Sequence, residues 1–198
     1  AITRRDRLDE VLAGLATAGA AGLGPVKVNA VLDPGSGLAD AVELLRFCLR
    51  YGYQLRIIEQ MPLDAGHQWR GDATLRADDL LPALGEHFTL SADPAPRGSA
   101  PAQLWQVDGG PATVGIIASV SHAFCAACDR TRLTADGQVR SCLFATEETD
   151  LRALLRGGAD DDALVTAWRT AMWRKAAGHG INDPDFIQPQ RPMSAIGG

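Results

Sequence analysis

The chain has 198 residues, of which 46% are hydrophobic and 22% are charged, and its formal net charge is −5. This composition is typical of a soluble globular protein with one sizeable domain or two small ones. The negative charge argues against nucleic acid as a partner, because nucleic-acid-binding domains are usually basic. No apolar run is long enough to cross a membrane, and no signal-peptide pattern opens the chain. We therefore expect a cytoplasmic protein whose cysteines stay reduced.

The first third of the chain alternates predicted helices and strands. Apolar periodicity predicts a helix that begins near Thr3, a strand over 26–31, a helix over 39–51 and a strand over 55–61. Glycines follow both helices, and Pro62 ends the second strand. This order is typical of βα units around a parallel sheet, so we predict an α/β fold.

Polar side chains inside these predicted strands are unusual. Lys27 and Asn29 point to the same face, because strand side chains alternate. In barrels of parallel strands, polar residues near the carboxyl ends of strands usually line the active site. A lysine at a strand end can equally extend its ammonium group into solvent. The residues alone leave both interpretations open.

The rest of the chain has a more mixed pattern. Asp136-Gly137 between short β-prone stretches predicts a tight hairpin with a two-residue turn. The prolines of the tail exclude a regular helix there. The remaining predicted elements are a short helix over 78–88, a loop over 91–102, a hairpin of 104–107 with 113–120, helices over 147–157 and 161–177, and an irregular tail over 182–198.

Three cysteines in a C-x2-C-x13-C pattern, Cys125, Cys128 and Cys142, are the strongest candidate site. Structural zinc and ordinary iron–sulfur clusters take four protein ligands, so three thiolates leave one metal position open. The hairpin at Asp136-Gly137 would return Cys142 towards the other two. Arg130 and Arg132 would place positive charge beside the open position. The pattern therefore indicates a metal centre that binds an anionic substrate.

Simpler interpretations of three residues stay open at this point. His122 lies three residues before Cys125 and could complete a Cys3His zinc site, in a non-catalytic module for protein contacts. His179, just past a predicted helix end, fits a cap or surface role better than a ligand role. Cys48, in an apolar helix pattern, is typical of a buried free thiol.

These pieces together resemble one family, the GTP 3′,8-cyclases of molybdenum cofactor biosynthesis, which are radical S-adenosylmethionine (SAM) enzymes. The most specific stretch is Phe-Cys-x2-Cys-Asp-Arg-Thr-Arg over 124–132, combined with a terminal Gly-Gly. The stretches that carry the resemblance are 26–29, 55–62, 124–137, 142–144 and 193–198.

The resemblance implies a role for each matching residue. Cys125, Cys128 and Cys142 would bind a [4Fe-4S] cluster whose iron without cysteine faces the guanine of GTP. Met61 would contact SAM. The residues implied in GTP binding are Lys27, Arg130, Thr131 and Arg132, with Arg56 near the phosphates or SAM, and the tail that enters the active site ends in Gly197 and Gly198.

The resemblance also implies a fold and a reaction. Residues 1–64 would be the last β/α units of an incomplete (β/α) TIM-type barrel, and 65–198 a smaller α+β iron–sulfur region. The family converts GTP to 3′,8-cyclo-7,8-dihydro-GTP by radical chemistry, and a cyclic pyranopterin monophosphate synthase takes the product onward. Members often dimerise, so a homodimer is a further expected partner.

One departure from the family pattern is clear. The family holds its SAM-cleaving [4Fe-4S] cluster with a C-x3-C-x2-C motif, and the four cysteines of this chain do not form it. We therefore expect this sequence to be the C-terminal part of a longer or split enzyme. Alone, it should not generate the SAM-derived radical, and it should expose apolar barrel edges.

Overall fold

The computed structural model describes residues 6–196, and these residues form two compact units. The first unit comprises the chain up to Ile58 together with Ala77–Arg97 and Ala102–Ile117. The second comprises Glu59–Arg76, Gly98–Pro101 and the chain from Ala118 onward. Two later segments thus return to the first unit, whereas the division at residue 64 that the resemblance implies remains a prediction.

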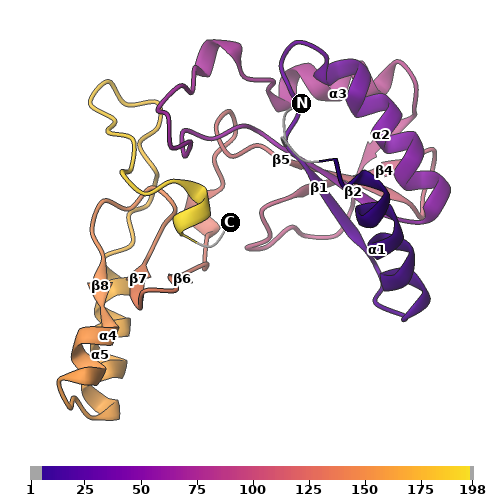
Figure 1. Ribbon diagram of the computed structural model, residues 1–198. Helices are drawn as coiled ribbons and strands as arrows, with labels where there is room; N and C mark the ends of the chain where they lie inside the picture. The colour runs from indigo at the N-terminus through magenta and orange to yellow at the C-terminus, as the bar shows by residue number, and fades with distance from the viewer. Residues whose placement is uncertain (1–5, 197–198) are drawn as a thin grey trace. The chain divides into compact units, whose positions relative to one another are not determined.

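A mixed five-stranded sheet forms the centre of the first unit (Figure 1). Its order is β1-β2-β5-β4-β3, with β1, β2 and β5 parallel and with β5, β4 and β3 antiparallel. The strands are β1 (Lys27–Ala30), β2 (Gln54–Ile58), β3 (Leu90–Ala92), β4 (Gln103–Val107) and β5 (Thr113–Ile117). The predicted parallel pair and the predicted β4–β5 hairpin are both confirmed.

Helix α2 (Gly37–Tyr51) packs against β2, with α3 (Ala77–Gly85) beside it (Figure 1). Its apolar side buries Leu45 and Cys48, and Gly52 ends it in the left-handed conformation (φ 71°) that glycine adopts without strain. Cys48 is therefore the buried free thiol that the sequence predicts, and burial raises its pKa to about 11.

The first helix, α1 (Leu8–Ala20), differs from α2 because it buries none of its side chains. Leu8 is 66% exposed and Val11 is 57% exposed. Strand β1, the next element, is an edge strand of the sheet. Exposed apolar side chains therefore lie on α1, whereas the exposed apolar barrel edge stays a prediction.

The second unit is built on a small antiparallel sheet and a helix pair (Figure 1). Helices α4 (Leu151–Arg156) and α5 (Asp161–Trp173) lie side by side, and each begins after an aspartate whose carboxylate accepts an N–H of the first turn. The strands are β6 (Arg132–Leu133), β7 (Gln138–Arg140) and β8 (Thr149–Asp150), and the short 3-10 turns are η1 (Gly71–Ala73), η2 (Cys125–Ala127) and η3 (Met193–Ala195).

Several predicted boundaries are wrong, each for a physical reason. The second strand stops at Ile58 because Glu59 turns inward and binds backbone amides of a neighbouring segment. The predicted helix over 147–157 is divided, because Thr149–Asp150 pairs with β7 before α4 starts. The β6–β7 hairpin forms as predicted, but its turn spans 135–137, since the Thr134 N–H bonds the Gln138 carbonyl.

The tail after α5 has no α-helix among its described residues, as its prolines predict. The architecture is mixed α/β, and the barrel implied by the resemblance remains a proposal. Among residues 6–196, no helix has both the length and the apolar character that a membrane span needs.

Candidate functional site

The three cysteines lie on two segments joined by the β6–β7 hairpin. Cys125 opens the turn η2, and the Cys128 N–H donates to the Cys125 carbonyl at 3.1 Å, which closes that turn. Cys142 follows β7 by two residues. All three are half-buried, in contrast to Cys48. The hairpin therefore does return the chain from Cys128 to Cys142.

The thiols lie within electrostatic reach of one another. Burial raises the pKa of Cys125, and an ionised Cys142 or Cys128 nearby raises it further. A backbone N–H of His179 opposes this by donating a hydrogen bond to the Cys125 thiol. Thiolates gathered in this way repel one another unless a cation or a metal group compensates their charge.

Arg130 is a cation in direct contact with one of these thiols. Its Nε and Nη2 lie 3.3 and 3.2 Å from the Cys128 sulfur, and its guanidinium lies 4.8 Å from the centre of the Phe124 ring. Burial alone would raise the pKa of Cys128, but the hydrogen bonds and charge of Arg130 lower it below its ordinary value. Arg130 therefore favours the thiolate form that metal ligation needs.

A metal centre is not itself visible in the side-chain arrangement. Within residues 6–196, no group of three or more His, Cys, Asp or Glu side chains is placed to hold one metal ion. Neither the cluster nor the zinc alternative with His122 is shown directly. The donor chemistry fits an iron–sulfur cluster, because such clusters take cysteine thiolates whose sulfurs accept N–H bonds.

The other two residues of the Arg130–Arg132 stretch face different groups. Thr131 Oγ1 donates to the Arg140 carbonyl at 3.3 Å, which ties β6 to β7. Arg132 Nη1 lies 3.4 Å from the carbonyl oxygen of Ile196, the last described residue of the tail. Burial, followed by the like charge of Arg130, lowers the pKa of Arg132. Arg132 thus links the cysteine loop to the tail.

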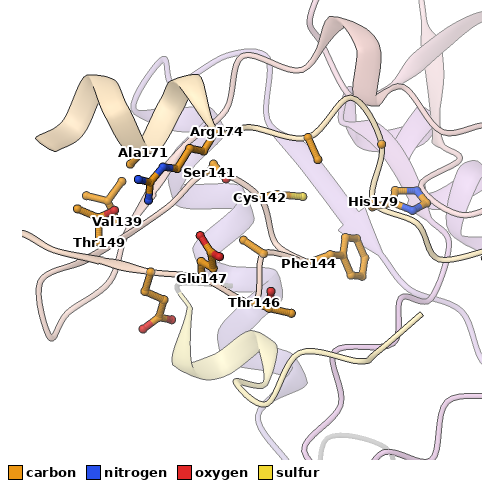
Figure 2. Close-up of a pocket in the computed structure, with 14 residues that line it drawn as sticks. Val139, Ser141, Cys142, Phe144, Thr146, Glu147, Thr149, Ala171, Arg174 and His179 are labelled. Atoms are coloured by element: carbon orange, nitrogen blue, oxygen red, sulfur yellow. The ribbon is translucent and has the colours of Figure 1, made fainter. Parts of the chain in front are cut away.

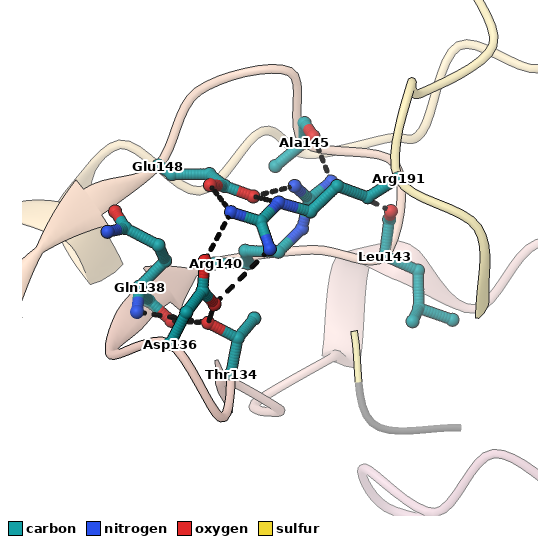
Figure 3. Close-up of polar contacts among 8 residues, drawn as sticks. All are labelled: Thr134, Asp136, Gln138, Arg140, Leu143, Ala145, Glu148 and Arg191. Carbon is teal, nitrogen blue, oxygen red and sulfur yellow. Dashed lines mark hydrogen bonds and ion pairs between the residues drawn. The ribbon is translucent and has the colours of Figure 1, made fainter. Parts of the chain in front are cut away.

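A cluster of ionic side chains supports the segment after Cys142 (Figure 3). Arg140 is only 3% exposed; it forms an ion pair with Glu148 and donates to the carbonyls of Leu143 and Ala145. These bonds fix the backbone that carries Cys142. A buried arginine of this kind depends on its carboxylate partner, because an unpaired buried charge is costly.

The tail is bound to the same group of ionic side chains. Arg191 Nη2 lies 2.8 Å from Asp136 in the hairpin turn, and its Nε lies 2.8 Å from Glu148. Two residues further on, the Met193 N–H donates to the Leu63 carbonyl at 2.9 Å. Ile196 is buried. The tail is therefore anchored up to the residue that precedes Gly197 and Gly198, which lie outside the described residues.

A cavity of about 270 Å³ lies beside Cys142 (Figure 2). Phe144 and His179 line it and contact each other with ring centroids 5.2 Å apart. The segment that follows α5 forms another wall, with Arg174 and Ala176. Through this cavity, molecules of the size of water can reach Cys142.

In the first unit, Lys27 and Arg56 are the sequence-predicted cations. Lys27 is exposed on β1, while Arg56 is in register with Asn29 on one side and Gly115 on the other. Gly115 leaves room for Arg56, since a Cβ there would come within 3.3 Å of the arginine stem. Arg56 Nε is buried without a hydrogen-bond partner in the described chain.

Neither Lys27 nor Arg56 forms an ion pair with a carboxylate of residues 6–196. Unpaired cations on neighbouring strands are suited to an anionic ligand. Met61 lies in the turn after β2, where its carbonyl accepts the Leu63 N–H at 2.8 Å. It is half-buried. Because β2 has already ended at Ile58, strand alternation does not decide which way Met61 points.

Comparison with known proteins identifies the family. The family described as Molybdenum Cofactor Synthesis C matches residues 53–181, which include the three cysteines, Arg130 and Arg132. The chain belongs to this family. The match leaves out Lys27 and the Gly-Gly tail, so their roles depend on the motif resemblance alone.

Members of the family in mycobacteria are similar over the whole chain. A protein of Mycobacterium bovis named GTP 3',8-cyclase 2 is 75% identical over 202 residues, and a GTP 3',8-cyclase of Mycobacterium sp. (strain KMS) is 77% identical over 197. Both alignments cover 100% of this chain and 56% of the relative. The chain thus spans about half the length of the relatives it matches.

Sequence reasoning missed three residues that organise the site in this member of the family. Glu59 is buried and accepts the N–H groups of Val120 and Ser121 at 2.7 and 2.8 Å, just before the first cysteine segment. Lys175 and His179 contact the cysteine segments directly. A glutamate at the end of an apolar strand was the available signal for Glu59.

His179 also corrects the expectation of a helix cap. Helix α5 ends at Trp173, so His179 does not follow the helix end directly. Its ring instead bonds the Ser119 carbonyl and the Ile181 N–H, at 2.9 and 3.1 Å.

Proposed function

We propose that this chain supplies the GTP-binding part of a GTP 3′,8-cyclase, in which Cys125, Cys128 and Cys142 hold a [4Fe-4S] cluster. The observation that carries the proposal is the group of half-buried thiols with Arg130 and a backbone N–H donating to their sulfurs. The printed name of the 75% identical relatives supports it. When bound, such a cluster supplies one iron without a thiolate, which can take a nitrogen or oxygen of a purine.

In each unit, taken by itself, cations are proposed to bind the phosphates of GTP. Among residues 6–196, Lys27 and Arg56 have no carboxylate partner, and the buried Arg56 Nε has no hydrogen-bond partner. Arg130 and Arg132 flank the thiols from the second unit, with Thr131 between them holding β6 to β7. A planar guanidinium suits phosphate oxygens, and desolvation would strengthen these contacts.

The remaining roles follow from the resemblance. Met61 would offer an adaptable apolar contact to SAM. Gly197 and Gly198 would enter the site after the anchored tail, where a terminus without side chains needs little room. The proposed product is 3′,8-cyclo-7,8-dihydro-GTP, consumed by a cyclic pyranopterin monophosphate synthase.

The wider assembly is part of the same proposal. We propose that residues 1–64 form the final β/α units of a radical SAM barrel, and that the SAM-cleaving cluster belongs to sequence that this chain does not contain. A homodimer is the proposed oligomeric state.

Anaerobic reconstitution of the chain with iron and sulfide tests the proposal. About four irons per chain and a broad visible absorption band are expected, because a [4Fe-4S] cluster holds four irons bridged by sulfide and absorbs by sulfur-to-iron charge transfer. Cys125→Ala should lose both. Cys48→Ala is the matched control and should retain both, because Cys48 is buried in α2. One zinc per chain with no visible band would overturn the cluster and favour a zinc module.

A further inference from the structure

One lysine bridges the two segments that carry the cysteines. Lys175 Nζ lies 2.6 Å from the Arg130 carbonyl oxygen and 2.6 Å from the Ser141 carbonyl oxygen. The first carbonyl lies two residues after Cys128, and the second belongs to the residue before Cys142. The two bonds therefore join the segment that follows Cys128 to the segment that precedes Cys142.

This contact is unusual for a lysine. An ammonium group normally remains in water, and holding it on two carbonyls costs side-chain entropy. Lys175 is half-buried and lies just past the end of α5, so the helix fixes its starting position. Its neighbour Arg174 is exposed. The adjacent cation, which lines the cavity beside Cys142, thus differs from Lys175 in burial.

The third cysteine is held from the same segment. The His179 N–H donates to the Cys125 thiol. The imidazole fixes this amide, because Nδ1 accepts the Ile181 N–H and Nε2 therefore carries the proton that the Ser119 carbonyl accepts. The ring also packs against Phe144. Residues 175–179 thus contact every cysteine-bearing segment.

We propose that Lys175 is a positioning residue, which holds the Cys128 and Cys142 segments at a fixed separation while His179 orients Cys125. The inference rests on the proposed cluster for its purpose, but the bridge itself is a property of the protein chain. Outer contacts of this kind commonly change metal affinity by 10–100-fold when they are removed.

Hydrogen exchange of the metal-free chain tests the bridge. In Lys175→Met, amides of residues 128–132 and 140–143 should exchange on the order of 10-fold faster, because the two segments lose their shared partner. Arg174→Met is the matched control; it removes the same charge one residue earlier and should leave both segments unchanged. Equal exchange in Lys175→Met and the wild-type chain would overturn the proposal.

The reconstituted chain provides a second readout. Lys175→Met should lose its cluster to a chelator on the order of 10-fold faster than the wild-type chain and Arg174→Met. The reduction potential should fall in Lys175→Met, where a nearby positive charge is lost, and should stay close to wild type in Lys175→Arg. Unchanged cluster loss and potential in Lys175→Met would count against the bridge.

The two proposals fail differently. A wild-type chain that takes up no cluster contradicts the proposed function, while hydrogen exchange still decides the bridge. If Lys175→Met does not fold, as judged by circular dichroism, Lys175→Gln replaces it. The glutamine side chain is one atom shorter and carries no charge, so exchange should rise in the same segments, and unchanged exchange would overturn the bridge.

Discussion

The cations near the candidate site differ in whether a carboxylate neutralises their charge. Arg140 and Arg191 are paired with carboxylates, and they support the hairpin and the tail. Lys27 and Arg56 have no such partner among residues 6–196, while Arg130 faces a thiol. Only cations that are not already neutralised can offer their charge to a substrate phosphate. Composition cannot make this distinction, because it depends on which side chain each cation meets.

The pairing of Asp136 with Arg191 predicts a pH dependence of stability. Hydrogen bonds from Arg191 and then from Thr134 lower the pKa of Asp136 well below its ordinary value. Glu148 and Arg140 are the other charges that face this pair. Because the folded pKa is the lower one, the stabilisation is complete above the unfolded pKa of about 4 and disappears as the pH falls through the folded pKa.

Urea unfolding of the metal-free chain measures this effect. The difference in midpoint between the wild-type chain and Asp136→Asn should be constant near pH 7 and shrink from about pH 4 downward. In an Arg191→Gln background the same substitution should have less effect. A difference that is independent of pH down to acid unfolding would contradict the pairing.

Sequence reasoning found the reactive residues but not their supports. The cysteine spacing and the neighbouring arginines were sufficient to locate the candidate site. Lys175 and Glu59 were missed because their partners are backbone groups far away in the sequence, at Ser141 and Val120 respectively. A backbone group leaves no pattern in the sequence, whether it accepts a hydrogen bond from Lys175 or donates one to Glu59. Such contacts become visible only in three dimensions.

Among the structural elements, the β6–β7 hairpin determines the spacing of the cysteines. Gly137 ends its turn with a φ of 82°, and its carbonyl accepts the first amides of α4. A Cβ at this position would meet the Arg152 Cβ at 2.6 Å. Gly158, just after α4, has the same φ of 82° but nothing within 4 Å. A comparison of the two glycines therefore separates the cost of a strained backbone conformation from the cost of a steric overlap.

Replacement of each glycine by alanine tests this difference. Gly158→Ala should cost about 1–2 kcal/mol of unfolding free energy, because alanine is strained in the left-handed region. Gly137→Ala should cost about 1–3 kcal/mol more, since α4 must also move away from the hairpin. Urea denaturation compares the two variants. Equal costs would show that α4 does not pack on the turn.

The pattern of elements was easier to predict than their ends. Apolar periodicity identified α2 and the parallel β1–β2 pair, because each repeats a spacing over several residues, whereas turn residues such as Asp136-Gly137 identified the hairpins. The end of β2 depended on Glu59 turning towards Val120 and Ser121, and β8 on pairing with β7. These are tertiary interactions, which local propensity does not encode.

At the scale of the whole molecule, the described residues form two units, and the first unit has an exposed apolar helix, α1. The helix α1 buries no side chain, and β1 is an edge strand. The relatives are longer, since the chain covers 56% of their length. An apolar helix beside an edge strand is a surface that further chain can cover. We propose that the full activity needs the length that these relatives have, with this chain contributing the substrate side.

The central claim is that the three cysteines hold a cluster that binds the purine of GTP. The most direct measurement is the electron paramagnetic resonance spectrum of the reduced, reconstituted chain with and without GTP, with inorganic triphosphate as the control. GTP should change the spectrum and triphosphate should not, because only GTP offers a ring atom to the iron without a thiolate. An unchanged spectrum with saturating GTP, or the same change with triphosphate, would contradict the claim.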